Sequence, residues 1–353
     1  MISIWCDFIE RNFLQTTFQE LVKQEFIEGA TSNPSIFASA LKSGNYEKEI
    51  AQMRKDLDSH RQPLSQGLQA KTIYENLALQ DIQSAAKILL HLYKKNPQNG
   101  LVSIEIDPNF CDDIESSVHE GVRLWQRLKC PNAMIKVPAT QSGFIIMQRI
   151  MSKGINVNAT LVFSKEQARR VLQAFNEAYK ERAHHTDAVS HDCGHTLCNP
   201  QGIISVFVSR FDREMDFVLP DSLRGKYGIC NAIDIYEDFQ ANNENANFRI
   251  LFASTGVKEK NALYNDMGYY VYPLAFENCV NTLPLATLQE IDYKKLRAIN
   301  PSDTPIFHSK VFKDIKKHLD SQGLSIETIE QKLLKDGLQS FKQSFKDMLD
   351  SLS

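Results

Sequence analysis

Eight short apolar or alternating segments recur along the chain, each followed by turn residues and then by helical sequence. Strands that alternate with helices form parallel βαβ units, and eight such units close an α/β barrel. The sequence therefore predicts an α/β fold, a (β/α)8 TIM barrel with additional helices. The expected strands are residues 3–6, 29–32, 101–106, 134–137, 156–163, 203–209, 249–254 and 270–274.

Two helix starts support this alternation of strands and helices. Pro34 follows Asn33 at a first-turn position, where a helix does not need the missing N–H. Residues 164–167 form a capping box directly after the strand that ends at Phe163, so strand and helix are joined by almost no loop.

The chain is longer than a minimal barrel, and the extra length gathers in three segments. We expect a single barrel domain over residues 1–353, with a helical insertion at about 34–100 and a His/Cys-rich loop insertion at about 183–201. The third segment, at about 325–352, predicts an amphipathic C-terminal helix that packs on the barrel. Its apolar residues at helical spacing are Ile326, Ile329, Leu333, Leu338, Phe341, Phe345, Leu349 and Leu352.

Charge and composition narrow the class of partner. The net charge is −3 and there is no long basic run, which argues against nucleic acid. No apolar run approaches the roughly 18 residues of a membrane span, and the first residues lack the basic and apolar parts of a secretory signal. Seven scattered cysteines, an odd number, fit a reduced setting better than a disulfide framework. We expect a cytoplasmic protein without nucleic-acid or membrane partners.

Polar side chains share one parity on several expected strands. Successive side chains of a strand point to opposite faces, so Lys136, between Ile135 and Val137, is predicted to point inside the barrel. Glu105 is predicted inside by the same alternation. Ser103 and Asp107 share the parity of Glu105. A similar polar face on a later strand is formed by Asn156, Asn158 and Thr160. Asp7 and Asn33 end the first two strands.

An interior lysine beside carboxylates points to chemistry. A buried charge costs several kcal/mol unless it is compensated or changes its protonation state. A lysine in an apolar wall is destabilised in its charged form, so the free amine can attack a carbonyl carbon and form an iminium ion. Glu105 and Asp7 are the carboxylates available as acid and base. The alternative, a buried ion pair without activity, is disfavoured because the carboxyl ends of barrel strands carry active sites.

Five segments together resemble the transaldolase family over nearly the whole chain. Residues 29–35 (GATSNPS) and 135–143 (IKVPATQSG) are similar to its two signatures, the second of which holds a Schiff-base lysine. The remaining segments, in the same order along the chain, are residues 103–107 (SIEID), 158–164 (NATLVFS) and 205–210 (SVFVSR).

The resemblance implies a role for each site residue. Lys136 would form the covalent adduct, Glu105 would move protons through a water held by Thr160, and Asp7 would take the C4 hydroxyl proton. Asn33, Asn158 and Ser205 resemble ligands of sugar hydroxyls, and Arg210 would hold the phosphate. The family's second phosphate-binding stretch departs from the pattern here, because the stretch after the seventh expected strand lacks an arginine. Ser254 and Lys258 are the candidates for binding the phosphate there. Lys258 also fits a solvated loop charge.

The family likeness implies a reaction and its substrates. A dihydroxyacetone unit would pass from sedoheptulose 7-phosphate or fructose 6-phosphate to glyceraldehyde 3-phosphate or erythrose 4-phosphate, in the non-oxidative pentose phosphate pathway. Two alternatives stay open: a related aldolase that releases free dihydroxyacetone, and a non-catalytic barrel that binds ligands or metal. A homodimer is expected by family analogy only.

The insertion crowds histidines and cysteines into a few residues. The spacing fits no closed zinc site, so we expect a polar loop on the barrel face away from the chemistry, with metal binding as the alternative. We expect no metal, and the proposed Schiff-base chemistry likewise leads us to expect no cofactor. The residues concerned are His184, His185, His191, Cys193, His195 and Cys198.

Overall fold

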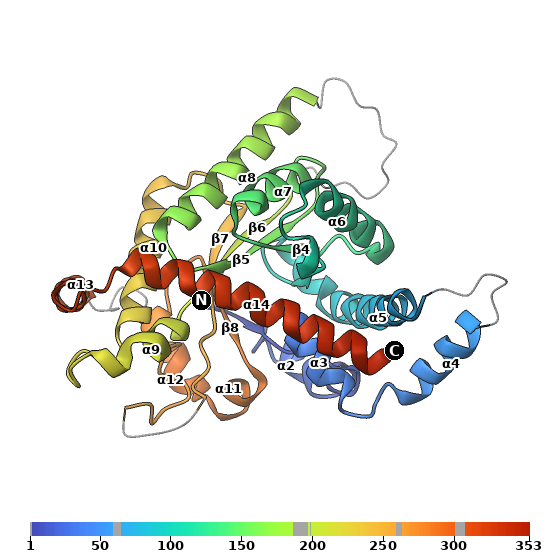
Figure 1. Ribbon diagram of the computed structural model, residues 1–353, viewed down its shortest axis with the longest axis horizontal. Coiled ribbons are helices and arrows are strands. Elements are labelled where there is room, and N and C mark those ends of the chain that lie inside the picture. Colours follow the sequence, from blue (N-terminus) through green and yellow to red (C-terminus); the bar gives the residue numbers. More distant parts are fainter. Residues whose placement is uncertain (1, 59–64, 186–196, 198, 259–262, 301–307) are drawn as a thin grey trace.

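The computed structural model describes residues 2–58, 65–185, 197, 199–258, 263–300 and 308–353. Within these residues eight parallel strands pair in chain order and close into a barrel, with β8 beside β1 (Figure 1). The (β/α)8 fold predicted from the sequence is therefore confirmed. The strands are β1 (Ser3–Cys6), β2 (Gly29–Thr31), β3 (Leu101–Glu105), β4 (Ala133–Pro138), β5 (Val157–Val162), β6 (Gly202–Phe207), β7 (Phe248–Ala253) and β8 (Cys279–Leu283).

Helices surround the barrel and join its strands. Between β7 and β8 the described residues form a short 3-10 turn, η3 (Tyr272–Leu274), in place of a long helix. The other 3-10 turns are η1 (Pro108–Phe110) and η2 (Asp216–Val218). The α-helices are α1 (Arg11–Gln15), α2 (Thr17–Lys23), α3 (Pro34–Leu41), α4 (Glu47–Asp58), α5 (Gln66–Lys95), α6 (Ile114–Leu128), α7 (Gln141–Met151), α8 (Lys165–His185), α9 (Ser209–Met215), α10 (Tyr227–Asn242), α11 (Leu285–Glu290), α12 (Tyr293–Ala298), α13 (His308–Ser321) and α14 (Ile326–Leu352).

Both helix starts expected from the sequence are present. Asn33 caps α3 with its side-chain oxygen, which accepts from the Ile36 N–H at 3.0 Å, and Pro34 occupies the first turn. Ser164 and Gln167 exchange hydrogen bonds of 3.1 Å in each direction, which is the expected capping box.

The eighth predicted strand is wrong. Residues 270–274 form part of η3 and its approach, and the eighth strand is Cys279–Leu283 instead. Pro273 has no N–H to give to a central ladder, so the Tyr-Val-Tyr propensity before it cannot produce an interior strand. Asn281 lies in the true strand and donates to the Leu274 carbonyl at 3.0 Å, which ties β8 to η3.

The barrel interior is apolar at one end and polar at the other. Six apolar side chains of the strands belong to one buried cluster, and Gly29 leaves room for one of them, since a Cβ there would lie 2.5 Å from the Trp5 ring. Toward the carboxyl ends of the same strands, the interior positions carry Lys136, Glu105 and Ser205. The fold therefore concentrates polar groups at the end where barrel enzymes bind substrates. The apolar residues are Trp5, Leu101, Met134, Ile203, Leu251 and Val280.

Helix α14 crosses the barrel at the polar end. Figure 1 shows it running in front of the strands, from the side of α9 toward α3 and α5, and it contacts all three of these helices and β5. Leu333, Phe341 and Phe345 are buried on its inner face. The C-terminal helix thus forms part of the wall around the polar end of the barrel.

The inserted segments are described in part. Residues 34–100 contribute α3, α4 and α5, and residues 59–64 lie outside the described part of the chain. Most of the His/Cys-rich insertion, residues 186–196 and 198, also lies outside it. No helix in the described ranges is both long and apolar enough to cross a membrane.

Candidate active site

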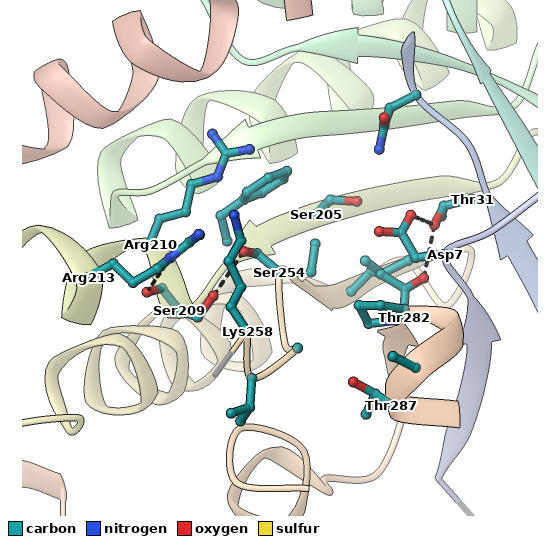
Figure 2. Close-up of a pocket in the computed structure, with 18 of the residues that line it drawn as sticks. Asp7, Thr31, Ser205, Ser209, Arg210, Arg213, Ser254, Lys258, Thr282 and Thr287 are labelled. Carbon is teal, nitrogen blue, oxygen red and sulfur yellow. Dashed lines mark hydrogen bonds between the residues drawn. The ribbon is translucent and has the colours of Figure 1, made fainter. Parts of the chain in front are cut away.

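A cavity of about 290 Å³ opens at the carboxyl ends of the strands. Figure 2 shows that its two ends differ: Asp7, Thr31 and Thr282 lie at one end, and Arg210, Arg213 and Lys258 lie at the other. The volume is near the lower limit of small-molecule sites, and the lining has both acidic and basic side chains. Such a pocket suits a small polar molecule that carries a negative charge at one end.

Lys136 and Glu105 form a buried pair at the base of this cavity. The Lys136 Nζ atom lies 3.7 Å from Glu105 Oε2 and donates to the Ser32 carbonyl at 3.1 Å. Burial raises the pKa of Glu105 to about 7, against the opposing effect of the Lys136 charge. Glu105 can therefore both give and take a proton near neutral pH.

Asp7 is held by two threonines from neighbouring strands. The Thr31 hydroxyl donates to Asp7 Oδ1 at 2.5 Å and lies 2.9 Å from the Thr282 hydroxyl (Figure 2). Because Thr31 has only one proton to donate, Thr282 must donate to Thr31. Burial raises the pKa of Asp7, while Lys136 and the Thr31 hydrogen bond act in the opposite direction.

Neutral polar side chains form a hydrogen-bonded chain across three strands. The Ser205 hydroxyl donates to Asn158 Oδ1 at 2.7 Å, and Asn158 Nδ2 donates to the Ser103 hydroxyl at 3.3 Å. Within the described residues, the buried Thr160 hydroxyl and Glu105 Oε2 have no hydrogen-bond partner. Two such buried atoms are the kind of group that an ordered water satisfies.

Three cationic side chains meet at the other end of the cavity. Burial and the nearby Arg213 lower the pKa of Arg210 to about 10, and its guanidinium lies 4.8 Å from the centre of the Phe207 ring. The charge of Arg213, followed by burial and the charge of Arg210, lowers the pKa of Lys258. The hydroxyls of Ser209 and Ser254 lie beside them, 3.0 Å apart (Figure 2). This end of the cavity can bind an anion.

Most of the residues named from the sequence line this one cavity. Glu105, Asn158 and Thr160 do not line it; Glu105 touches Lys136, and Asn158 touches Ser205. The side-chain oxygen of Asn33 is used in capping α3, so its Nδ2 group is the part free to donate. The lining residues are Asp7, Asn33, Lys136, Ser205, Arg210, Ser254 and Lys258.

Sequence reasoning missed several lining residues. Arg213 lies three positions after Arg210 on α9, a spacing that places both on one helix face and could have identified it. Thr31 has the inward parity of its strand, opposite Ala30. Thr282 lies on the strand that was not recognised.

The described residues contain no group of three or more His, Cys, Asp or Glu side chains arranged to hold a metal ion. Most histidines and cysteines of the His/Cys-rich insertion lie outside the described residues. The metal alternative for the insertion therefore stays a prediction.

Comparison with known proteins gives a consistent match over the whole chain. Residues 4–352 match the family described as Transaldolase/Fructose-6-phosphate aldolase. A transaldolase of Helicobacter pylori (strain Shi470) is 41% identical over 99% of this chain and 98% of its own length. A transaldolase of Campylobacter jejuni subsp. doylei is 38% identical over 99% of both chains.

Proposed function

Because this chain belongs to the Transaldolase/Fructose-6-phosphate aldolase family, we propose that the enzyme, a transaldolase, transfers a dihydroxyacetone unit between sugar phosphates through a Schiff base on Lys136. The donors are sedoheptulose 7-phosphate and fructose 6-phosphate, and the acceptors are glyceraldehyde 3-phosphate and erythrose 4-phosphate. The pathway is the non-oxidative pentose phosphate pathway, and the reaction needs no cofactor. A cytoplasmic location and a homodimer stay predictions.

The observation that carries the proposal is the buried Lys136 amine beside Glu105. In the proposed first step, Lys136 Nζ adds to the ketone carbon of the donor, and the resulting carbinolamine loses its hydroxyl as water. This loss requires an acid, and Glu105, with a pKa of about 7, can supply the proton. The product is an iminium ion whose nitrogen can accept an electron pair.

Cleavage of the donor requires a base that can reach the C4 hydroxyl of the substrate. Asp7 takes the proton of the C4 hydroxyl, the C3–C4 bond breaks, and its electrons move to the iminium nitrogen. An aldose phosphate leaves and an enamine stays on Lys136. The acceptor aldehyde then takes the enamine carbon, Asp7 returns its proton to the new hydroxyl, and water releases the product ketose. The charge coupling between Asp7 and Lys136 supports this pairing of base and nucleophile.

The remaining side chains bind the substrate. Asn33 and Ser205 line the cavity and are proposed to hydrogen-bond sugar hydroxyls, with Asn158 orienting Ser205. Arg210, Ser254 and Lys258 are proposed to bind the phosphate. The unpartnered Thr160 hydroxyl supports a water between it and Glu105 that carries protons during iminium formation and hydrolysis.

An acceptor experiment tests the transfer reaction. Purified enzyme is incubated with fructose 6-phosphate alone and together with erythrose 4-phosphate. A transaldolase forms sedoheptulose 7-phosphate and glyceraldehyde 3-phosphate only when the acceptor is present. Release of free dihydroxyacetone without acceptor would identify an aldolase instead. Absence of both reactions would favour a non-catalytic barrel.

A further inference from the structure

Arg213 is a cation at the binding cavity with no assigned task. It lies on α9 one helical turn after Arg210 and lines the same cavity. Among the described residues its side chain makes one protein hydrogen bond, a long one of 3.4 Å from Nε to the Ser209 carbonyl. Its side chain is exposed, so no packing role accounts for the guanidinium at this position.

The three cations at this end of the cavity are close to one another. Arg213 is the largest cause of the lowered pKa of Lys258 and the second cause for Arg210. Like charges placed together repel, so an empty cluster is held at an electrostatic cost. Figure 2 shows the amine end of Lys258 close to the side-chain ends of Arg210 and Arg213, with the Ser209 and Ser254 hydroxyls beside the Lys258 side chain.

In the part of the chain that the structure describes, no carboxylate neutralises this cluster directly. Within the described residues, neither Arg210, Arg213 nor Lys258 forms a salt bridge. The carboxylates that act on the cluster from beyond salt-bridge distance are Glu105 and Asp336 on Arg210, and Asp212 on Arg213. Three neighbouring positive charges around two hydroxyls favour an anion that carries two negative charges and several acceptor oxygens. A phosphomonoester dianion has both properties.

We propose that Arg213 binds the phosphate of the substrate directly, together with Arg210 and Lys258, and so makes the enzyme selective for phosphorylated donors and acceptors. This inference rests on the function proposed above, because it uses the same cavity. Phosphorylated donor and acceptor occupy the same subsite in turn, so Arg213 acts on both. In this proposal the dihydroxyacetone unit bound to Lys136 makes no contact with Arg213, because it carries no phosphate.

Arg213→Met tests this role, because methionine keeps part of the apolar stem and removes the charge. Arg169→Met is the matched control: Arg169 is an exposed arginine of α8 that pairs with Asp238 on the outer surface. For Arg213→Met we expect kcat/KM for fructose 6-phosphate to fall about 10- to 100-fold, mainly through KM, as for loss of a charged hydrogen bond. We expect a similar rise in the KM for erythrose 4-phosphate, and no change in the control.

Two further measurements separate binding from folding and from chemistry. Inorganic phosphate, titrated calorimetrically into each protein, should bind the Arg213→Met variant about 10- to 100-fold more weakly than wild type. Borohydride reduction with unphosphorylated dihydroxyacetone should label Lys136 equally in wild type and variant, which also shows that the variant is folded. Arg213→Lys, which keeps the charge but loses the forked donor, should lie between wild type and Arg213→Met.

Unchanged KM values and unchanged phosphate affinity in Arg213→Met would overturn the inference. A wild-type enzyme that is not labelled at Lys136 and transfers nothing would instead refute the proposed function. The calorimetric phosphate titration would still report on Arg213 in that case, so the two failures are distinguishable.

Discussion

Glu105 Oε2 lies 3.7 Å from Lys136 Nζ inside the barrel, and both side chains are almost fully buried. Burial raises the pKa of Glu105 to about 7, close to the value that suits proton transfer at neutral pH. The relationship links the fold to the chemistry, because strand pairing sets it: Glu105 and Lys136 are register partners on β3 and β4.

Replacing Glu105 with Gln should remove the proton donor while keeping the shape of the side chain. We expect kcat to fall about 10²- to 10⁴-fold, as for loss of a general acid or base. The ionisation near pH 7 should also disappear from the pH profile of kcat/KM. Glu120→Gln, at a buried carboxyl paired with Lys71 outside the cavity, is the control. A Glu105→Gln enzyme that kept the ionisation would contradict this role.

Thr31→Val tests how Asp7 is tuned. The Thr31 hydrogen bond lowers the pKa of Asp7, so its loss should raise that pKa further. A base must be ionised to act, and the acidic limb of the pH–activity profile should therefore move to higher pH. Steady-state kinetics from acidic to neutral pH measure the limb. A shift to lower pH, or none, would show that Asp7 does not supply that limb.

Gly337 lets α14 approach the phosphate end of the cavity. A Cβ at this position would lie 2.8 Å from Leu161 Cδ2 and 2.9 Å from Arg210 Nη1. Gly337→Ala should therefore displace the Arg210 guanidinium and raise the KM for phosphorylated substrates by roughly 5-fold. The melting temperature should change little, because the higher helix propensity of alanine offsets the crowding.

Gly67, near the start of α5, is the matched control for this prediction, since nothing lies within 4 Å of the position its Cβ would take. Gly67→Ala should leave KM unchanged. Equal KM values for Gly337→Ala and wild type would show that α14 does not constrain Arg210.

Asp212 should make stability depend on pH. It is fully buried on α9, accepts from the Gly228 N–H at 2.9 Å, and has a pKa that burial raises from the ordinary 3.8 to about 7. Between these two values the folded protein holds a proton that the unfolded chain has lost, so this contribution to stability falls as pH rises from about 4 to about 7 and is absent above that. Asp212→Asn should melt at a higher temperature than wild type at pH 8 and at a similar temperature near pH 4. Calorimetry at the two pH values checks this, and a variant that is less stable than wild type at pH 8 would contradict it.

Much of the fold and part of the candidate site could be predicted from the sequence because strands alternate their side chains. The alternation around Lys136 and Glu105 predicted an inward amine and carboxylate, and both lie inside the barrel. The same signal failed at β8, where Asn281 and Thr282 interrupt the apolar pattern and residues 270–274 mimic a strand. Alternation predicts which face of a strand a side chain takes only once the residues that form the strand have been identified.

Contacts between distant segments could not be predicted in this way. Helical spacing indicated a C-terminal helix, but its path across the cavity depends on how Gly337 meets Leu161 and Arg210, which no local pattern encodes. Arg213 was overlooked because a surface arginine on a helix is normally solvated, although its spacing from Arg210 places both on one helix face.

Mass spectrometry of the borohydride-reduced complex tests the central claim most directly. Wild-type enzyme is incubated with fructose 6-phosphate, reduced and digested, and Lys136→Met is treated in parallel. The account predicts a dihydroxyacetone-derived adduct on the peptide that contains Lys136, and none in the variant. An adduct on another lysine, or an unmodified Lys136 in an enzyme that still transfers the three-carbon unit, would contradict it.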